Sequence, residues 1–338
     1  MNILLTGGAG YIGSHTAVVL IQAGHEVVLL DNFCNSDPSV LERLATIVGK
    51  PVSCIEGDVR DTDLVEKVLR EYKLDAVIHF AGLKSVAESA TDPILYYENN
   101  VCGSVSLIKA MQNAKVKKIV FSSSACVYGD PVYLPYDEEH PTKPMNTYGW
   151  SKLQVEQILK SIADSDPEWA VSCLRYFNPA GAHESGLIGE NPNGIPNNLM
   201  PYILKVAAGE LPYLTIYGND YNTIDGTGVR DYIHVMDLAE GHLAGLRYIK
   251  ANAGFDVINL GTGKGTSVLQ VIKSFEKAID RKLLYQFGSR RDGDLSEYFG
   301  DVKKAKDNLN WAANRDLDHM CQTLSYWQSR EKLKDRMK

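Results

Sequence analysis

Closely spaced pairs of cysteines are absent from this sequence of 338 residues, although it contains six cysteines. No two of them form a C-x-x-C pair, and none has a spacing to the eight histidines that is typical of a metal site. They are Cys34, Cys54, Cys102, Cys126, Cys173 and Cys321. We therefore expect free, buried thiols, with no disulfide framework and no metal centre.

An excess of positive charge is also missing. Lys and Arg total 35 against 42 Asp and Glu, which leaves a net charge of −7. Affinity for nucleic acids depends on clustered Lys and Arg, so the sequence argues against a general nucleic-acid-binding protein. An anionic ligand must instead be bound in a local pocket.

No hydrophobic run reaches the length of a membrane span, and an apolar strand pattern opens the chain without a basic leader segment. The composition, 44% hydrophobic and 23% charged, is ordinary for a soluble globular protein. These features predict a cytoplasmic protein with no membrane partner.

Short apolar runs alternate with helical patterns in the first half of the chain. The runs predict strands at residues 2–6, 26–31, 52–58, 75–80, 118–124 and 170–177. Helical patterns lie between them, at about 14–23, 61–72, 93–114 and 147–163. This alternation predicts an α/β protein with a doubly wound, Rossmann-type parallel sheet.

The character of the sequence changes after residue 177. Residues 178–231 are rich in Gly, Pro and Asn, and long loops of this kind are usually functional or disordered. A later apolar run at 256–260 could return to the sheet as another strand. We expect a Rossmann-type domain over 1–177, joined by that strand, and a smaller, loop-rich substrate-binding region over 178–338.

A glycine-rich turn lies between the first predicted strand and the first predicted helix. It can be read as G-x-x-G-x-x-G through Gly7, Gly10 and Gly13, or as G-x-G-x-x-G beginning at Gly8. Glycines here let the backbone approach a pyrophosphate, and the helix N-terminus supplies N–H donors. The alternative is a turn that only connects strand and helix.

Polar and small residues follow several predicted strands, at the edge where a doubly wound sheet binds its ligand. Asp31 lies near the offset of about 20 residues expected for a ribose-binding carboxylate, which favours NAD over NADP. Asp58 could meet the adenine, although an aspartate at a strand end is as often a turn residue or a helix cap. The fourth and fifth strands end in Phe80, Ala81, Gly82, Ser122, Ser123 and Ser124.

Tyr148 and Lys152 form a Y-x-x-x-K pattern on one face of a predicted helix. Tyrosine alone is a poor base at neutral pH, because its ordinary pKa is about 10. A nearby ammonium group and an oxidised nicotinamide would both favour tyrosinate, which could accept a proton while hydride leaves the same carbon. The pattern alone is weak, because many amphipathic helices carry Tyr and Lys at this spacing.

Taken together, these residues resemble the signature of the extended short-chain dehydrogenase/reductase family. The resemblance extends to about Tyr298 and is greatest to the members that epimerise UDP-hexoses. It includes long strings at residues 10–16, 79–84, 175–179, 196–201 and 226–235. It implies reversible C4 epimerisation of UDP-galactose and UDP-glucose through a 4-keto sugar, with NAD tightly bound. It also implies a homodimer formed by the helices that begin at Pro93 and Thr147.

The resemblance also implies roles for individual residues. Tyr148 would act as acid and base, Lys152 would lower its pKa and bind ribose, and Ser124 would be a hydrogen-bond partner or proton shuttle. The implied NAD-binding residues are Gly7, Gly10, Tyr11, Ile12, Gly13, Asp31, Asn32, Asn35, Asp58, Val59, Phe80, Ala81, Gly82, Lys84, Asn99, Ser122, Tyr148, Lys152 and Phe177. The implied UDP-sugar-binding residues are Lys84, Ser124, Tyr148, Asn178, Asn198, Leu199, Thr215, Tyr217, Arg230, Arg291, Asp294 and Tyr298.

Some positions carry further implications. Guanidinium groups bind phosphate oxygens bidentately, which suits Arg230 and Arg291 to a diphosphate. A large residue at Tyr298 implies that N-acetylhexosamines are excluded. Cys126 replaces a threonine that is usual in the family, and Trp150 is unusual inside the Y-x-x-x-K pattern but should point away from the cofactor.

Three other functions stay open at this point. A sugar-nucleotide 4,6-dehydratase needs an acid and a base that normally follow the serine, where Ala125 and Cys126 stand here. A uronate epimerase or decarboxylase would need a basic group near the sugar C6. An inactive NAD-binding regulator would not need Tyr148, Lys152 and Ser124 together.

Overall fold

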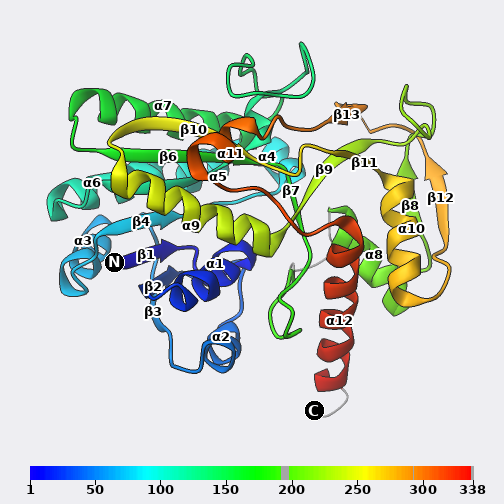
Figure 1. Cartoon of the computed structure of the whole chain (residues 1–338), viewed down its shortest axis with the longest axis horizontal. Coiled ribbons are helices and arrows are strands. Elements are labelled where there is room, and N and C mark those ends of the chain that lie inside the picture. Colours follow the sequence, from blue (N-terminus) through cyan, green and yellow to red (C-terminus); the bar gives the residue numbers. More distant parts are fainter. Residues whose placement is uncertain (192–197, 292, 336–338) are drawn as a thin grey trace.

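The computed structural model describes residues 1–191, 198–291 and 293–335, so Pro196 and Asn197 of the 196–201 string lie outside the described residues. Seven parallel strands form the central sheet in the order β10-β6-β5-β4-β1-β2-β3. The predicted doubly wound sheet is therefore confirmed (Figure 1). The strands are β1 (Asn2–Thr6), β2 (Glu26–Asp31), β3 (Ser53–Glu56), β4 (Ala76–His79), β5 (Lys118–Ser124), β6 (Ala170–Tyr176) and β10 (Gly254–Leu260).

Helices cover both faces of this sheet (Figure 1). Leu5 faces one core layer and its neighbour Leu4 faces the other, because successive side chains of a strand point to opposite faces. A strand buried on both faces needs a continuous apolar run, which is why these runs could be recognised in the sequence. The first layer contains α1 (Tyr11–Gln22), α2 (Val40–Val48), α9 (Val235–Ala251) and α11 (Lys303–Leu309); the second contains α3 (Thr62–Glu71), α6 (Gly103–Ala114) and α7 (Thr147–Ser165).

The C-terminal half returns to the sheet more extensively than the sequence predicts. β10 pairs with β6 at the sheet edge, as the run at 256–260 predicts, and α9 and α11 pack on one face. Other segments form a second lobe with its own core, on the right of Figure 1. It contains α8 (Leu199–Ala208), β8 (Leu214–Tyr217), α10 (Val268–Ile279), β12 (Tyr285–Gly288) and α12 (Leu317–Asp335).

A small sheet connects the two lobes. Its central strand β9 (Val229–His234) pairs with β7 (Asn178–Ala180), with β11 (Gly265–Ser267) and with β13 (Glu297–Tyr298). Four segments that are far apart in the sequence thus meet beside the carboxyl ends of the main strands.

The helix predicted over residues 93–114 is not one α-helix. After α4 (Val86–Thr91) and α5 (Pro93–Tyr96), residues Tyr97–Cys102 form a π-helical turn before α6 begins. Asn100 lies buried in this turn, accepts a hydrogen bond from Leu83 N (2.7 Å) and donates one to Ser151 Oγ (3.0 Å). The wider turn accommodates this polar contact, which hydrophobic periodicity does not reveal.

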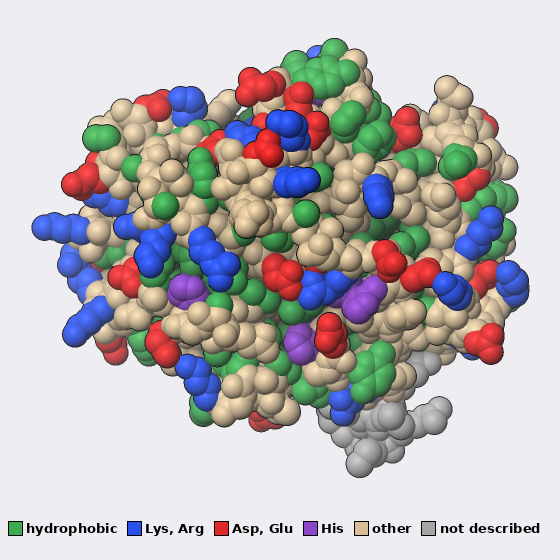
Figure 2. Space-filling view, viewed as in Figure 1, with side chains coloured by type: hydrophobic (Ala, Val, Ile, Leu, Met, Phe, Trp, Pro, Cys, Tyr) green, Lys and Arg blue, Asp and Glu red, His purple; other side chains and the backbone are tan. Residues whose placement is uncertain are grey.

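The cysteines and the surface charges bear on the compositional expectations. All six cysteines are free, but Cys34 and Cys102 are exposed, so the expectation of buried thiols is wrong for these two. On the face shown in Figure 2, acidic and basic side chains are interspersed rather than gathered into a basic patch. Within residues 1–191, 198–291 and 293–335, no helix has both the length and the apolar character needed to cross a bilayer.

Three histidines are almost completely buried in the Rossmann-type layers: His15 on α1, His79 at the end of β4 and His242 on α9. Burial lowers the pKa of His15 and His79 to about 3 and that of His242 to about 4, from 6.5. They are neutral in the folded protein. Below about pH 6.5 the unfolded chain therefore binds protons that the folded chain does not.

We expect the stability supplied by these histidines to be complete above about pH 6.5 and to be lost as the pH falls towards their folded pKa values. Each should cost about 1.4 kcal/mol per pH unit in that window. Urea unfolding between about pH 8 and pH 5 measures the slope. His242→Gln should make the slope shallower, whereas His25→Gln, at a less buried site, should change it less; equal slopes in all three proteins would contradict the prediction.

Candidate active site

The glycine turn between β1 and α1 is shaped by contacts that exclude side chains. Gly7 has φ +67°, and a Cβ there would lie 2.7 Å from Ala81 N; one at Gly13 would collide with the Gly7 carbonyl oxygen. Gly10 is the N-cap of α1, where no side chain caps the helix and no acidic residue lies in the first turn. The backbone is thus close to an open, partly positive helix end, which fits the pyrophosphate of a dinucleotide.

Asp31 holds the glycine turn and the loop after β2 together. Its Oδ2 accepts a hydrogen bond from Ala9 N (2.9 Å), and its Oδ1 accepts from Phe33 N and Ser36 Oγ (both 2.9 Å). A carboxylate has about four acceptor positions, so the group can still accept a bond from a ribose hydroxyl.

Asp58 is occupied by neighbouring side chains. Arg60 forms two hydrogen bonds to the carboxylate (2.9 and 2.8 Å) and Asn32 donates a third (3.0 Å). The Arg60 hydrogen bonds are the main reason why the pKa of Asp58 falls to about 2. Its predicted contact with adenine stays a prediction.

The loop after β4 brings Gly82 and Lys84 to the same edge. Gly82 has φ +154°, and a Cβ there would lie 3.0 Å from Asn100 Oδ1 and 3.9 Å from Lys152 Nζ. Asn100 is a site residue that was not predicted, since nothing in the sequence distinguishes it from other polar residues of a helix. Lys84 forms an ion pair with Glu190 (2.7 Å), a second residue that was missed.

Tyr148, Lys152 and Ser124 come together as predicted from the family pattern. Asn146 caps α7 by accepting a hydrogen bond from Gly149 N (2.8 Å), which places Tyr148 in the first turn. Lys152 Nζ lies 5.9 Å from the centre of the Tyr148 ring and donates to the Ser122 carbonyl oxygen (2.8 Å). The Ser124 side chain lies near enough to the Tyr148 phenol to lower its pKa.

Burial dominates the protonation of this group. Burial, followed by Tyr176 and Cys126, raises the pKa of Tyr148 well above 10, and the neighbouring Ser124 side chain opposes this shift. Burial also lowers the pKa of Lys152 to about 8. The expected effects of Lys152 and of an oxidised nicotinamide on the Tyr148 phenol stay predictions, and desolvation of the phenolate opposes them.

A buried ion pair lies behind Lys152. Glu156 accepts hydrogen bonds from Arg175 Nε (3.0 Å), Arg175 Nη2 (2.6 Å) and Ser123 Oγ (2.5 Å), and it raises the pKa of Lys152. Glu156 continues the four-residue spacing of Tyr148 and Lys152 along α7. That spacing is visible in the sequence and would have placed Glu156 on the same helix face as Tyr148 and Lys152.

Several predicted sugar-nucleotide residues meet beside β9 and β13. Arg230 forms an ion pair with Asp294 (2.8 Å) and its guanidinium lies 4.7 Å from the centre of the Tyr298 ring. The Tyr298 hydroxyl donates to Asn178 Oδ1 (2.8 Å). The cationic Arg230 and the polar Asn178 are thus available to a ligand that enters next to Tyr298.

A second contact places Arg291 over the Tyr217 ring, 3.9 Å from its centre. Thr215 is on β8 with Tyr217, whereas Asn198 and Leu199 begin α8. The roles of Thr215, Asn198 and Leu199 in binding the sugar nucleotide stay predictions.

The remaining predicted cofactor residues lie on several different elements. Asn99 donates to the Leu95 carbonyl oxygen (2.8 Å), and the Phe177 ring lies 6.0 Å from that of Tyr298. Ser122 Oγ hydrogen bonds with Tyr176 Oη. The others are found in the first turn of α1 or in strand-end loops: Tyr11, Ile12, Asn35, Val59, Phe80 and Ala81.

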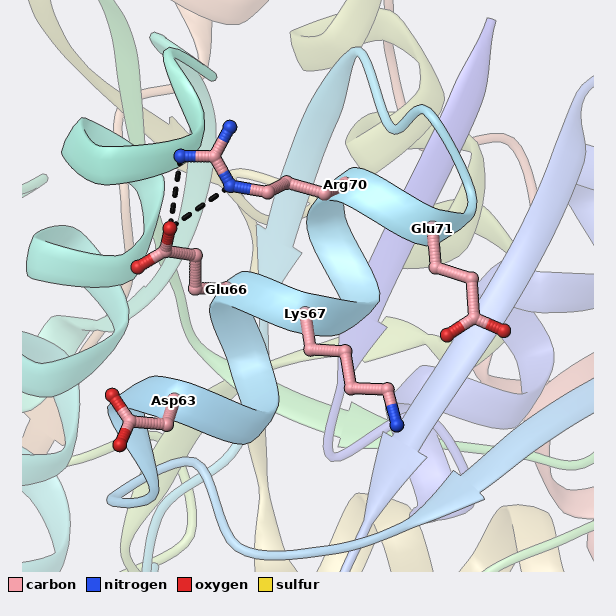
Figure 3. Close-up of a pocket in the computed structure, with 5 residues that line it drawn as sticks. All are labelled: Asp63, Glu66, Lys67, Arg70 and Glu71. Carbon is pink, nitrogen blue, oxygen red and sulfur yellow. Dashed lines mark hydrogen bonds and ion pairs between the residues drawn. The ribbon is translucent and has the colours of Figure 1, made fainter.

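A separate hollow on α3 does not belong to this arrangement. Five charged residues of one helix line it, and within it Arg70 pairs with Glu66 (2.8 Å; Figure 3). Such i, i+4 pairs on a solvated helix face are common and need no ligand.

Comparison with known proteins agrees with this geometry. A family model described as GDP-mannose 4,6 dehydratase matches residues 4–324. A UDP-glucose 4-epimerase from Pasteurella multocida is 55% identical over 331 residues, which cover 98% of each chain. The chain belongs to the UDP-glucose 4-epimerase family.

Solved structures in this UDP-glucose 4-epimerase family have the same fold. The enzyme from Stenotrophomonas maltophila, crystallised with NAD and formylated UDP-arabinopyranose, is 47% identical, with a TM-score of 0.97 and 99% of each chain covered. The enzyme from Bifidobacterium longum, in complex with NAD⁺ and UDP, is 51% identical, with a TM-score of 0.94 and 98% of this chain and 99% of that chain covered.

Proposed function

We propose that this chain interconverts UDP-galactose and UDP-glucose at C4 of the hexose, with NAD as its cofactor and Tyr148 as acid and base. The observation that carries the proposal is the buried group formed by Tyr148, Ser124 and Lys152 at the carboxyl edge of the sheet. Family membership and the open glycine turn at α1 support it.

Tyr148 Oη takes the proton of the sugar 4-hydroxyl and later returns it. The chemistry that bound NAD supplies is reversible removal of hydride from C4, which gives a transient 4-keto sugar. Because burial raises the pKa of Tyr148, its ionised form depends on the neighbouring Ser124 side chain and on nearby positive charge. Lys152, with a pKa of about 8, supplies an ammonium group at neutral pH.

Inversion requires a pocket that is firm around UDP and loose around the hexose. Arg230 and Arg291 are suited to the diphosphate, and Asp294 orients Arg230 through their ion pair. The keto sugar can then turn between the two hydride transfers while UDP stays bound.

The chain lacks the acid and base that a 4,6-dehydratase requires, although the matching family model is described by that activity. Ala125 and Cys126 follow Ser124, and burial raises the pKa of the Cys126 thiol. A thiol that stays protonated is a poor base, so this position favours epimerisation over loss of water.

A homodimer is part of the proposal, as is a cytoplasmic location. Ile94, Val105 and Trp150 expose 64%, 47% and 40% of their surface on α5, α6 and α7, the helices that the family resemblance assigns to subunit contact. Beside them a shallow groove is lined by Val101, Gln154, Gln157, Ile158, Ser161 and Ile162. Sedimentation equilibrium should give the mass of two chains, and the mass of one would overturn this part.

The test of the activity is incubation of the purified protein with UDP-galactose without added cofactor, followed by chromatography for UDP-glucose. Product would support both the epimerase and retained NAD. If none forms, NAD and then UDP-glucuronate are added. No turnover in any of these three assays would favour an inactive NAD-binding regulator.

Tyr298→Cys tests the proposed exclusion of N-acetylhexosamines. Loss of the ring and of its hydrogen bond to Asn178 opens space beside the sugar, so UDP-N-acetylglucosamine should become a substrate. We expect a gain of at least about tenfold in kcat/KM for that substrate, since relief of one steric conflict is worth about 1–3 kcal/mol. An unchanged kcat/KM for UDP-N-acetylglucosamine would show that Tyr298 does not exclude N-acetylhexosamines.

A further inference from the structure

Residues 181–190, which follow β7, form a segment that we call the strap. At its start, the Gly181 carbonyl oxygen accepts a hydrogen bond from Tyr11 Oη (2.6 Å), which belongs to the first turn of α1. Further along, the Leu187 carbonyl oxygen accepts one from Arg43 Nη1 on α2 (3.3 Å), and Ile188 is buried in the core. These contacts attach the strap to the Rossmann-type layers.

The opposite side of the strap is attached to α12. Arg330 Nη1 donates to the Ser185 carbonyl oxygen (2.6 Å). Gly189 lies so close to Trp327 that a Cβ would be 2.6 Å from that ring. The strap is therefore held from both lobes, and the position of its last residue, Glu190, is set by this packing.

Glu190 lies between the two loops that form the proposed cofactor site. Its side chain is 7% exposed and forms a 2.7 Å ion pair with Lys84, whose side chain is 58% exposed, in the loop after β4. It also lies near enough to Tyr11 to raise that pKa, after burial. One buried carboxylate thus connects the glycine-turn side with the β4 side.

We propose that Glu190 is a positioning residue that holds Lys84 across the dinucleotide site and so slows the release of NAD, an inference that rests on the proposed function. Release requires the glycine turn and the β4 loop to separate. The strap opposes that separation, because it is anchored to Tyr11 at one end and to Lys84 at the other. A buried carboxylate is costly to desolvate unless it is paired, so the closed arrangement with Lys84 is favoured.

The test compares Glu190→Gln with the wild type, both loaded with NAD. NAD release is followed by a coupled dehydrogenase that reduces free NAD, so the readout does not depend on epimerisation. Loss of one partner of a charge pair acts mainly on dissociation, and we expect release to be roughly tenfold faster in the variant. Glu276→Gln is the matched control. Glu276, on α10, has a side chain that is 11% exposed, and it pairs with Lys282 at the same distance of 2.7 Å.

A Glu190→Gln protein with the wild-type melting temperature and the wild-type release rate would overturn the proposal, as would equal acceleration by Glu276→Gln. Salt gives a second test on the wild type alone. Because Lys84 is more than half exposed, added salt should weaken its pair and speed release in the wild type but not in Glu190→Gln. If the wild type binds no NAD at all, the proposed function fails first and the inference fails with it.

Discussion

Tyr148→Phe should lower epimerisation of UDP-galactose by roughly 10²- to 10⁴-fold, the usual contribution of a positioned acid or base. The variant keeps the ring, so its packing against Lys152 and its place at the start of α7 should remain. Only the phenolic hydroxyl, which lies near Ser124, is lost. NAD content should stay near that of the wild type.

The measurement is kcat for UDP-galactose together with the amount of NAD extracted from each purified protein. Tyr248→Phe is the control, since the Tyr248 hydroxyl donates to Asp256 (2.9 Å) outside the proposed machinery. A Tyr148→Phe protein that holds NAD and keeps more than about a tenth of the wild-type rate would contradict acid–base catalysis by this phenol.

Glu156→Gln should lower the free energy of unfolding by about 3–5 kcal/mol, because it leaves the buried Arg175 charge without its partner. It should also remove the charge that raises the pKa of Lys152. At pH 7 less of Lys152 would then be protonated, so the folded variant should regain activity as the pH is lowered. The wild type should gain no activity over the same pH range.

Urea unfolding measures the first effect, and a pH profile of kcat/KM measures the second. Asp164→Asn is the control for the first: the Lys160–Asp164 pair is exposed at both ends, and such pairs contribute less than about 1 kcal/mol. A loss in Glu156→Gln no greater than in Asp164→Asn would show that the pair does not hold α7. An unshifted pH profile would contradict the proposed effect of Glu156 on the pKa of Lys152.

Much of the central sheet could be predicted, for a physical reason. Its strands are covered on both faces, so Ile3, Leu4 and Leu5 must all be apolar, and an uninterrupted run is visible without any neighbour. Asp61 likewise caps α3 by accepting from Leu64 N (3.0 Å), a contact within three residues. Short-range contacts leave a mark in the local sequence.

The π-helical turn and its residue Asn100 could not be predicted in this way. The partner of Asn100 is the backbone of Leu83, which a helical pattern does not encode. The pairs Lys84–Glu190 and Arg230–Asp294 join residues on different elements and are equally invisible before folding. The desolvation that raises the pKa of Tyr148 is invisible in the sequence for a related reason, because burial depends on every element packed around the phenol.

By itself, the sequence determined the order of strands and helices, the glycine turn and the placing of Tyr148 and Lys152 on one helix face. Each of these depends on residue types over a few positions. Only the tertiary structure decided which charges meet, how deeply Tyr148 is buried and where Glu190 lies. Those properties come from distances between segments that the chain brings together only when its hydrophobic layers pack.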